Sequence, residues 1–521
     1  MLDFLFITSP SNASNPHPPY YFLYLIQYLE NAGFSCKLID PKGKDTPEHM
    51  GKHMLDIRAA LLRNPSRFVG LAAFHSDYDM VMKLGKMIKE CQPYTTLMVG
   101  NAHPTINPED FIYVDSPFDI AILGEGEATC EEIAKLKTLN NATLQEVKSI
   151  AYLNIINTDL VGQIEEIGMC KTEPRVFIDM EEVGIPAYEH IDLDSYLQPQ
   201  KSVVRRLYMK MMPIFAGRGC PFHCTFCAAD AVWKANKGKA CRLRTVDSVI
   251  KEIHWLRMRG MDFFYLFDDM FGMNKKWTEE WYIKKAEYDE EHGMIPYACQ
   301  TRADIADENM IIRLRETGCI QMDFGVEAGS QRLLDFVKKK ITKDQVRNAF
   351  SLCKKHKMRS FATMLLNLPS ETEEDVKETY EFLKEIDPTA GLIFGVTTPY
   401  PGSEIYKFCD PPLKKEEYGL LINNRLNPLE RFRMADHDLD LEKVWNKWNR
   451  DFKATPMFER MWAMNPFQPL YWAAILKSKN KSEYIKAWSK DLIKTFLLFW
   501  SHKFNFYRFL KRIQYKKNCK Y

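Results

Sequence analysis

The feature that most constrains the fold of this sequence is an alternation of short apolar runs with amphipathic segments. Near the N-terminus the apolar runs are residues 3–7, 36–40, 68–74, 95–100 and 118–124. Apolar residues between the first two runs recur at helical spacing until Gly33, and a second helix is expected over 78–90. Strands that alternate with helices predict a parallel sheet covered on both faces.

The same alternation resumes after residue 205. Its apolar runs are residues 213–217, 263–269, 297–304, 321–329, 361–369 and 391–403. The sequences TKDQ (342–345) and SETE (370–373) have the spacing of a capping box, which opens a helix. Six strand–helix units predict a parallel (β/α)6 barrel, complete or partial, in which the chemistry gathers at the carboxyl ends of the strands.

The chain is long enough for several domains. With 521 residues it exceeds the roughly 250–300 residues of a single core. We expect an N-terminal α/β domain over 1–145, a connector over 146–204, a barrel over 205–410 and a mostly helical C-terminal region over 411–521. Within the connector, residues 149–166 predict a β-hairpin and residues 184–197 an extended crossing segment.

Composition excludes several classes of protein. The net charge of +2 indicates no nucleic-acid partner, and 13 cysteines, mostly isolated, indicate a reducing cytoplasm rather than a disulfide scaffold. No apolar run reaches the roughly 18–20 residues of a membrane helix. Asp3 and the absence of a basic leader argue against a signal peptide.

Three cysteines follow the strand predicted at 213–217. Cys220, Cys224 and Cys227 are thiolate donors suited to zinc, copper(I) or an iron–sulfur cluster. Zinc would need a fourth ligand, and the adjacent His223 is awkwardly placed to supply it. A four-iron cluster held by three cysteines would leave one iron open to a substrate or cofactor.

The crevice loops of the N-terminal domain are rich in glycine. Gly100, Gly124 and Gly126 follow predicted strands, where open α/β sheets bind ligands. No GxGxxG sequence follows the first strand. From these loops alone, ordinary turns are the favoured interpretation, because that fingerprint is absent.

The cysteine spacing CxxxCxxC after the first barrel strand resembles that of the radical S-adenosylmethionine (SAM) enzymes. The sequences CQTRAD, FGVEAGS, LLNLPSETEED and TPYPGS resemble later strand ends of the subgroup that carries a cobalamin-binding domain. VGLAAF, VGNAHPT and ILGEGE resemble that N-terminal, Rossmann-like domain. The resemblance covers roughly residues 1–410.

The resemblance implies a 4Fe-4S cluster on the three cysteines, with SAM bound to the fourth iron and cleaved to a 5′-deoxyadenosyl radical. Phe226 would lie beside the adenine, and Glu327 would contact the bound SAM. Gln300 and Arg302 would point into the same mouth. The alternative for Glu327 is a carboxylate that only pairs with Arg302.

The resemblance also implies cobalamin in the N-terminal crevice, near Gly100, Asn101, Glu125 and Gly126. The sequence departs from the subgroup at Gly100-Asn101, where a Gly-Gly pair is usual, and Asn101 would narrow the space beside the corrin. The DxHxxG motif that supplies a histidine to cobalt is absent.

Five polar residues near these two sites each have two possible roles. His17, His75 and His103 lie in crevice loops and are either cobalt ligands or plain loop residues. Asp268 and Asp269 end a barrel strand. They either line the mouth or touch SAM or substrate.

The function expected from the resemblance is methylation of an unactivated carbon in a small-molecule or lipid-like substrate. The alternatives are a cyclase or rearrangement enzyme without methyl transfer, and a non-enzymatic cluster and corrin sensor. A flavodoxin- or ferredoxin-type protein would supply the electron. Residues 471–521 hold 13 Lys/Arg against two acids, interleaved with aromatic residues. This tail is either a helical cap on the barrel or a peripheral membrane contact.

Overall fold

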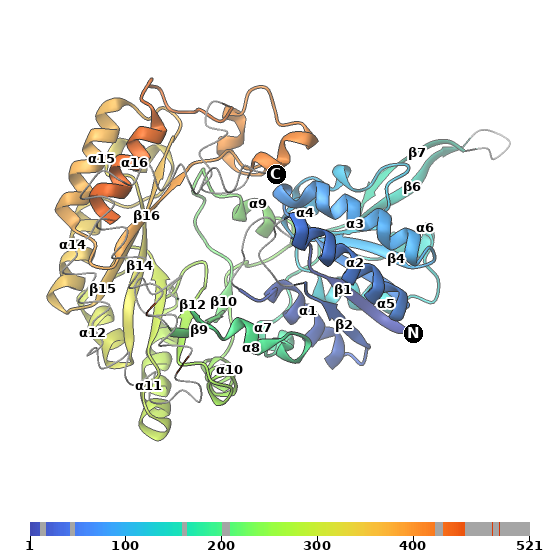
Figure 1. Ribbon diagram of the computed structural model, residues 1–521, viewed down its shortest axis with the longest axis horizontal. Coiled ribbons are helices and arrows are strands. Elements are labelled where there is room, and N and C mark those ends of the chain that lie inside the picture. Colours follow the sequence, from blue (N-terminus) through green and yellow to red (C-terminus); the bar gives the residue numbers. More distant parts are fainter. Residues whose placement is uncertain are drawn as a thin grey trace.

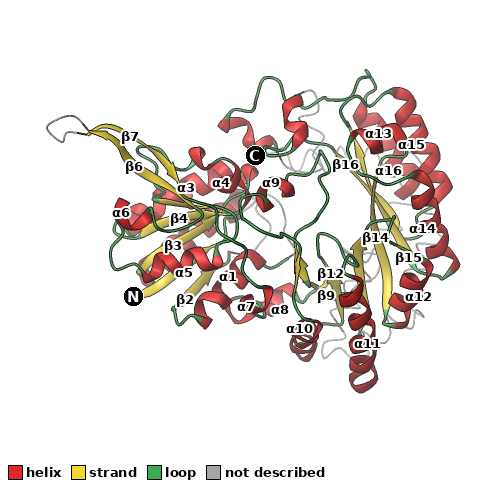
Figure 2. Ribbon diagram, turned by 180° about the vertical axis from the view of Figure 1, so that it is seen from behind, coloured by secondary structure: helices red, strands yellow, loops and turns green. Residues whose placement is uncertain are grey.

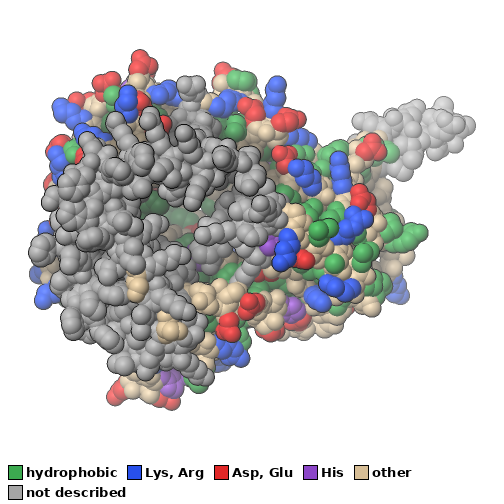
Figure 3. Space-filling model, viewed as in Figure 1, with side chains coloured by type: hydrophobic (Ala, Val, Ile, Leu, Met, Phe, Trp, Pro, Cys, Tyr) green, Lys and Arg blue, Asp and Glu red, His purple; other side chains and the backbone are tan. Residues whose placement is uncertain are grey.

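The computed structural model describes residues 1–10, 17–41, 47–158, 164–200, 209–421 and 431–453, and the single residues 482 and 489. Two α/β bodies lie side by side, an N-terminal one and a central one (Figure 1). On the space-filling surface of the N-terminal body, basic and acidic side chains are interspersed rather than gathered by sign (Figure 3).

The N-terminal body is built on a seven-stranded sheet. Its strands run in the order β2-β1-β3-β4-β5-β6-β7, parallel up to β5 and antiparallel from there. Because the order reverses between β1 and β3, a crevice opens at the carboxyl ends of these strands. The strands are β1 (Leu2–Ile7), β2 (Cys36–Ile39), β3 (Ser66–Ala72), β4 (Thr96–Gly100), β5 (Ile120–Ile122), β6 (Ile150–Thr158) and β7 (Ile164–Lys171).

Helices cover both faces of this sheet, as the alternating pattern predicts. The helices α1 (Tyr20–Asn31) and α5 (Glu127–Lys135) pack together on one face. The pair α2 (Pro47–Arg63) and α3 (Tyr78–Cys91) covers the other. Two short helices, α4 (Ala102–Ile106) and α6 (Asn141–Leu144), follow β4 and α5. The hairpin β6–β7 confirms the one predicted at 149–166 and extends the same sheet.

The central body is a partial barrel of six parallel strands. The order is β16-β15-β14-β13-β12-β9, and a short strand, β8 (Pro199–Gln200), pairs antiparallel with β9. Within the described residues the two edges do not pair, so the predicted (β/α)6 barrel is open. The parallel strands are β9 (Met209–Ile214), β12 (Phe263–Leu266), β13 (Tyr297–Thr301), β14 (Cys319–Glu327), β15 (Arg359–Leu366) and β16 (Gly391–Val396).

Helices line the outer face of this sheet (Figure 2). They are α10 (Val246–Met258), α11 (Lys275–His292), α12 (Glu308–Glu316), α13 (Gln331–Phe336), α14 (Lys343–Lys355) and α15 (Glu373–Ile386). Thr342 and Gln345 form the predicted capping box of α14. The box predicted at 370–373 is wrong by two residues, because Thr372 and Asp375 cap α15 instead.

The connector departs from the extended segment predicted over 184–197. It forms two short helical turns, η3 (Tyr188–His190) and α8 (Leu193–Tyr196), after the one-turn helix α7 (Met180–Val183). Tyr188 explains the difference. Its ring is buried, and its hydroxyl donates a 2.6 Å hydrogen bond to Glu252 of α10.

The two bodies share a hydrophobic core. One cluster of buried residues runs from α1 and α5 into the barrel, so the two bodies are in direct apolar contact. Tyr20 of α1 donates a 2.7 Å hydrogen bond to the carbonyl of Pro213 in β9. A second cluster lies under α2 and α3, and the segment after the barrel, with η5 (Lys415–Leu420), packs against it.

The last described helix, α16 (Leu441–Lys453), covers the edge strand β16. Trp448 is 2% exposed, and the indole of Trp445 donates to the carbonyl of Phe394 at 3.5 Å. None of the described helices has both the length and the apolarity to cross a bilayer. Within the basic tail the structure describes only residues 482 and 489, so the two roles predicted for the tail stay predictions.

Candidate functional site

The cysteine loop begins at β10 (Gly217–Arg218), which pairs with β11 (Arg242–Leu243). Asp268 and Asp269, at the end of β12, hold its backbone. The Gly217 N–H donates to Asp268 at 2.9 Å, and the Gly219 N–H donates to Asp269 at 3.1 Å. Burial raises the pKa of the Asp268 carboxyl to about 7. Within the described contacts, these two acids position the loop.

The middle of the loop is fixed to the barrel at Thr225. Its N–H donates to the carbonyl of Val337 at 3.0 Å, and its carbonyl accepts from Ile405 at 3.1 Å. The Cys227 N–H closes a turn onto the carbonyl of Cys224, also at 3.0 Å. The backbone of the loop is therefore held at three places, by the two aspartates after β12, by Val337 and by Ile405.

The three cysteine thiols are half-buried and free. Burial raises the pKa of each thiol, while the positive charge of Lys339 acts to lower it. Among the described residues, only Glu30, Glu189 and His190 place three ligand atoms within 4.8 Å of one another. At least one pair of the three sulfurs is therefore more than 4.8 Å apart, beyond the roughly 3.8 Å that Zn–S bonds of about 2.3 Å imply. A cluster of several irons fits this spacing better than one ion.

His223 is turned away from a ligand role. Its Nδ1 lies 2.7 Å from Asp230, and its side chain is 63% exposed. This geometry does not support the zinc alternative.

Glu327 lies beside the cysteine loop, but its partner differs from the predicted one. Its Oε1 accepts a 2.8 Å hydrogen bond from the buried Lys339, whereas Arg302 pairs with Asp304 at 2.9 Å. The alternative pairing of Glu327 with Arg302 is therefore wrong. The backbone of Glu327 has a φ of +68° and follows a bulge in β14. Strained backbone of this kind is concentrated at functional sites.

The remaining residues expected near SAM lie around the same mouth. The Arg302 guanidinium stacks 3.7 Å from the ring centre of Phe222 in the cysteine loop. Phe226 is half-buried and packs against the main core. Gln300 is half-buried in β13, and its carbonyl accepts from Phe271 at 3.0 Å. A carbon added at Gly325 would come within 2.8 Å of the Lys339 ammonium, so glycine leaves room for the Glu327–Lys339 pair.

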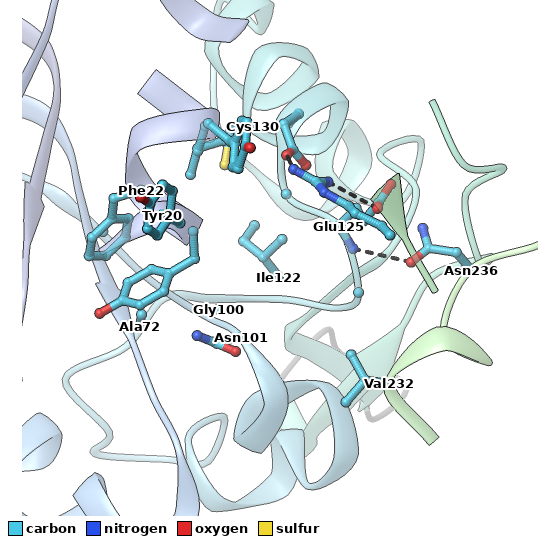
Figure 4. A pocket seen from close by; sticks show the side chains of 18 of the residues that line it. Tyr20, Phe22, Ala72, Gly100, Asn101, Ile122, Glu125, Cys130, Val232 and Asn236 are labelled. Carbon is cyan, nitrogen blue, oxygen red and sulfur yellow. Dashed lines mark hydrogen bonds and ion pairs between the residues drawn. The ribbon is translucent and has the colours of Figure 1, made fainter. Parts of the chain in front are cut away.

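A cavity of about 390 Å³ opens where the carboxyl ends of the N-terminal sheet face the cysteine loop (Figure 4). Its lining is mainly apolar and aromatic, with Tyr20 and Phe22 of α1 on one side. All four residues predicted near cobalamin line it, namely Gly100, Asn101, Glu125 and Gly126. An apolar lining that includes several glycines suits a macrocycle edge that needs close approach to backbone.

Asn101 keeps the backbone of the glycine that it replaces. Its φ of +86° and ψ of −164° fall in a region that glycine alone adopts readily. Its side chain accepts a 2.7 Å hydrogen bond from the Ala102 N–H and caps α4. Asn101 lines the cavity (Figure 4), and the narrowing beside a corrin stays a prediction.

The wall between this cavity and the cysteine loop is a charge bridge, formed by Arg218, Arg242, Glu125 and Glu127. Arg218 donates to Glu125 at 3.0 Å and to Glu127 at 2.7 Å. Arg242 donates to Glu125 at 2.5 Å. The side chains are only 5–17% exposed. Because β10 and β11 place the two arginines opposite each other, the glutamates offset a like-charge repulsion.

The histidines of the crevice loops do not line the cavity. His103 bonds Asp110 at 2.8 Å and stacks on His75 at 3.8 Å between ring centres. Tyr418 and Lys415, from the segment after the barrel, contact the same Asp110 at 3.0 and 3.2 Å. His75 and His103 therefore belong to the contact between the N-terminal body and the segment after the barrel.

His17 lies near a ring that borders the cavity. Its ring centre is 5.8 Å from that of Phe267, and burial lowers its pKa to about 4. None of the histidines in the described part of the chain offers a nitrogen to the cavity itself.

Sequence reasoning did not single out Lys339, Glu127, Arg218 or Arg242. Lys339 stands in a run of three lysines, and the pattern gives no reason to choose among them. The only available signal for Arg218 was its place inside the GRGC turn.

Comparisons with known proteins agree with this geometry. Residues 214–383 match the family model of the radical SAM superfamily, and residues 11–134 match that of the B12 binding domain. An uncharacterized methyltransferase of Pyrococcus horikoshii is 26% identical over 395 residues, covering 75% of this chain and 78% of that protein. The anaerobic magnesium-protoporphyrin IX monomethyl ester cyclase of Rubrivivax gelatinosus is 24% identical over 480 residues, covering 90% and 79%.

A solved structure has the same fold. It is that of the radical SAM methyltransferase TsrM from Kitasatospora setae, with tryptophan substrate and a SAM analogue bound. The TM-score is 0.56 at 17% identity, covering 78% of this chain and 76% of that chain. The two matched domains, the relatives and the shared fold together show that the chain belongs to the radical SAM enzymes that carry a B12-binding domain and use a 4Fe-4S cluster, SAM and cobalamin.

Proposed function

We propose that this enzyme methylates an unactivated carbon of a small-molecule or lipid-like substrate, with residues 1–145 binding cobalamin and residues 205–410 binding the cluster and SAM. One observation carries the proposal. Arg218 of the cysteine loop lines the glycine-lined cavity and pairs there with Glu125 and Glu127, so a radical source and a methyl donor would lie next to each other.

Cys220, Cys224 and Cys227 would hold the cluster. The support is their chemistry and spacing, since all three are free soft donors and at least one pair of their sulfurs is more than 4.8 Å apart. When bound, the cluster supplies the electron that cleaves SAM, and the corrin supplies a methyl group. The backbone anchors at Gly217, Gly219 and Thr225 keep the three thiols in place.

Glu327 and Lys339 would orient the bound SAM. They form a buried ion pair at the barrel mouth, where a zwitterionic amino-acid end can exchange partners with both groups. Arg302 and Phe222 would close one side by their stacked contact. Phe226 and Gln300 complete the predicted SAM contacts.

Gly100, Asn101, Glu125 and Gly126 would contact the corrin. The apolar lining would exclude water from its reactive face. Because none of the described histidines lines the cavity, cobalt would receive no imidazole from the described part of the chain. Glu125 would contribute to the cavity wall chiefly through its ion pairs with Arg218 and Arg242.

The second candidate is ring formation or rearrangement without methyl transfer. The similarity to the Rubrivivax gelatinosus cyclase over 90% of this chain favours keeping it. The fold and the residues at the barrel mouth are compatible with both reactions, so methyl transfer and cyclisation are distinguished by analysing the reaction products.

The experiment is anaerobic reconstitution of the full chain with iron, sulfide and cobalamin, followed by reduction with dithionite or flavodoxin. Mass spectrometry then measures products from SAM and cell extract. Methyl transfer predicts S-adenosylhomocysteine together with 5′-deoxyadenosine. Deoxyadenosine alone supports cyclisation or rearrangement. If neither appears with a fully loaded cluster, the chain does not cleave SAM and the sensor hypothesis gains.

A further inference from the structure

A second, larger cavity lies on the other side of the charge bridge. Its volume is about 1430 Å³, which exceeds the roughly 300–1,000 Å³ of ordinary small-molecule sites. Arg218, Trp233 and Asn236 line both cavities, and Cys220 lines this one. A molecule here would therefore border the cysteine loop and lie next to the proposed corrin cavity.

Eight Lys and Arg residues line this second cavity, and most have a carboxylate partner. Arg218 and Arg242 belong to the charge bridge, and Arg244 pairs with Glu252. Lys234 pairs with Asp230 at 2.5 Å, and Lys237 with Glu173 at 2.7 Å. These five cations are therefore balanced by the protein itself.

The other three cations are Lys239, Lys275 and Lys276. They are exposed, and none forms an ion pair within the described part of the chain. They come from two separate elements, the loop before β11 and the first turn of α11. The cavity wall thus carries three positive charges that the described residues leave unbalanced.

The acids of the same wall are already engaged. Glu280 pairs with Lys284 at 2.8 Å, and Asp230 also contacts His223. Asp268 accepts the Gly217 N–H, and Asp179 caps α7 by accepting the Glu181 N–H at 3.0 Å. None of these four contacts Lys239, Lys275 or Lys276.

The start of α11 agrees with this charge pattern. Its first turn has no acidic residue, whereas the first turns of α10, α12, α14 and α15 each have one or more. Two lysines at a helix N-terminus are unfavourable in the field of the helix dipole. A bound anion at this wall would offset that cost.

We propose that the second cavity is the substrate compartment, and that it takes a substrate with a carboxylate or phosphate group bound by Lys239, Lys275 and Lys276. This inference rests on the proposed function, because it assigns the substrate class of the same enzyme. The anionic end would face the three lysines, while the reacting carbon would approach the wall that holds Cys220 and Arg218.

The test is isothermal titration of the reconstituted full chain with inorganic pyrophosphate and, separately, with citrate. We expect one of the probes to bind at low salt, and its affinity to fall at 0.3 M KCl by screening. Replacing the lysines together, as Lys239→Gln, Lys275→Gln and Lys276→Gln, should weaken binding at least tenfold, since each exposed ion pair contributes about two- to fivefold. Lys384→Gln, in α15 and outside the cavity, removes an exposed ion pair with Glu381 and should leave the affinity unchanged.

Tighter binding of pyrophosphate would identify a phosphoryl group, and tighter binding of citrate a carboxylate. No binding by the wild-type chain, or binding that the triple substitution leaves intact, would overturn the inference. The two failures can be told apart. Absence of 5′-deoxyadenosine with the wild-type enzyme would contradict the proposed function, whereas absence of anion binding would contradict only this inference.

Discussion

The charge bridge gives the most demanding test of how the two bodies are joined. In Glu127→Gln, Arg218 keeps Glu125 but loses the carboxylate that lies 2.7 Å from its other nitrogen. Arg218 and Glu127 are 17% and 5% exposed, so water cannot replace the lost charge. The bridge, which is neutral in the native chain, is left with one uncompensated positive charge.

The size of the effect follows from burial. Breaking a fully buried ion pair costs about 3–5 kcal/mol. The bridge is slightly exposed and Arg218 retains one partner, so we expect about 2 kcal/mol. The amides of Gly217 and Gly219 flank Arg218 and report its local opening. A loss of about 2 kcal/mol corresponds to roughly 30-fold faster hydrogen exchange at these two amides.

Hydrogen exchange followed by mass spectrometry, on peptides that span 215–221, measures this change. Lys135→Gln is the control on the same helix, because its pair with Glu131 is exposed and should alter exchange at most about twofold. A double-mutant cycle with Arg218→Met isolates the pair itself. Exchange that rises less than threefold in Glu127→Gln would refute the reasoning, because the bridge would then behave as a surface salt bridge.

Three further substitutions test individual residues. Cys224→Ala should abolish SAM cleavage and lower bound iron while cobalamin binding, followed by its absorbance, persists; normal cleavage would exclude the cluster assignment. Asn101→Gly should raise the urea midpoint by the equivalent of about 1 kcal/mol because it relieves the positive φ, whereas Asn101→Ala should lower it. Asp268 has a pKa of about 7 in the folded protein, higher than in the unfolded chain. Its protonation therefore stabilises the fold fully below about pH 4, and this stabilisation is lost as the pH rises to 7. Asp268→Asn should therefore gain up to about 4 kcal/mol at pH 8 and little at pH 4, as measured by denaturation at both values; equal gains at both would contradict the burial argument.

Much of the fold follows from local sequence, because its elements are defined by periodicity. Both sheets, the hairpin and the box at Thr342 come from patterns that extend over a few neighbouring residues. The helix α2 was not predicted, since only a narrow stripe of it is buried, with Ile57 and Leu61 as its fully buried members. A polar helix of this kind is recognised only when the surface that it covers is known.

The candidate site was predictable only in part, for a related reason. The three cysteines form a local motif, so their position after the first barrel strand could be inferred. The partner of Glu327 is 12 residues away, in a turn after α13, and that turn sets which of three lysines reaches it. Likewise, the loop-holding role of Asp268 and Asp269 depends on contacts about 50 residues apart.

The contact between Tyr20 and Pro213 has a consequence for synthesis of the chain. The two residues are 193 positions apart, and ribosomes add about 5–20 residues per second. The aromatic face of α1 therefore waits on the order of 10–40 s for its partner strand to emerge. During that interval the nascent N-terminal body exposes an apolar surface to which chaperones can bind. Slowing translation between these positions should lower the yield of folded protein before any cofactor is loaded.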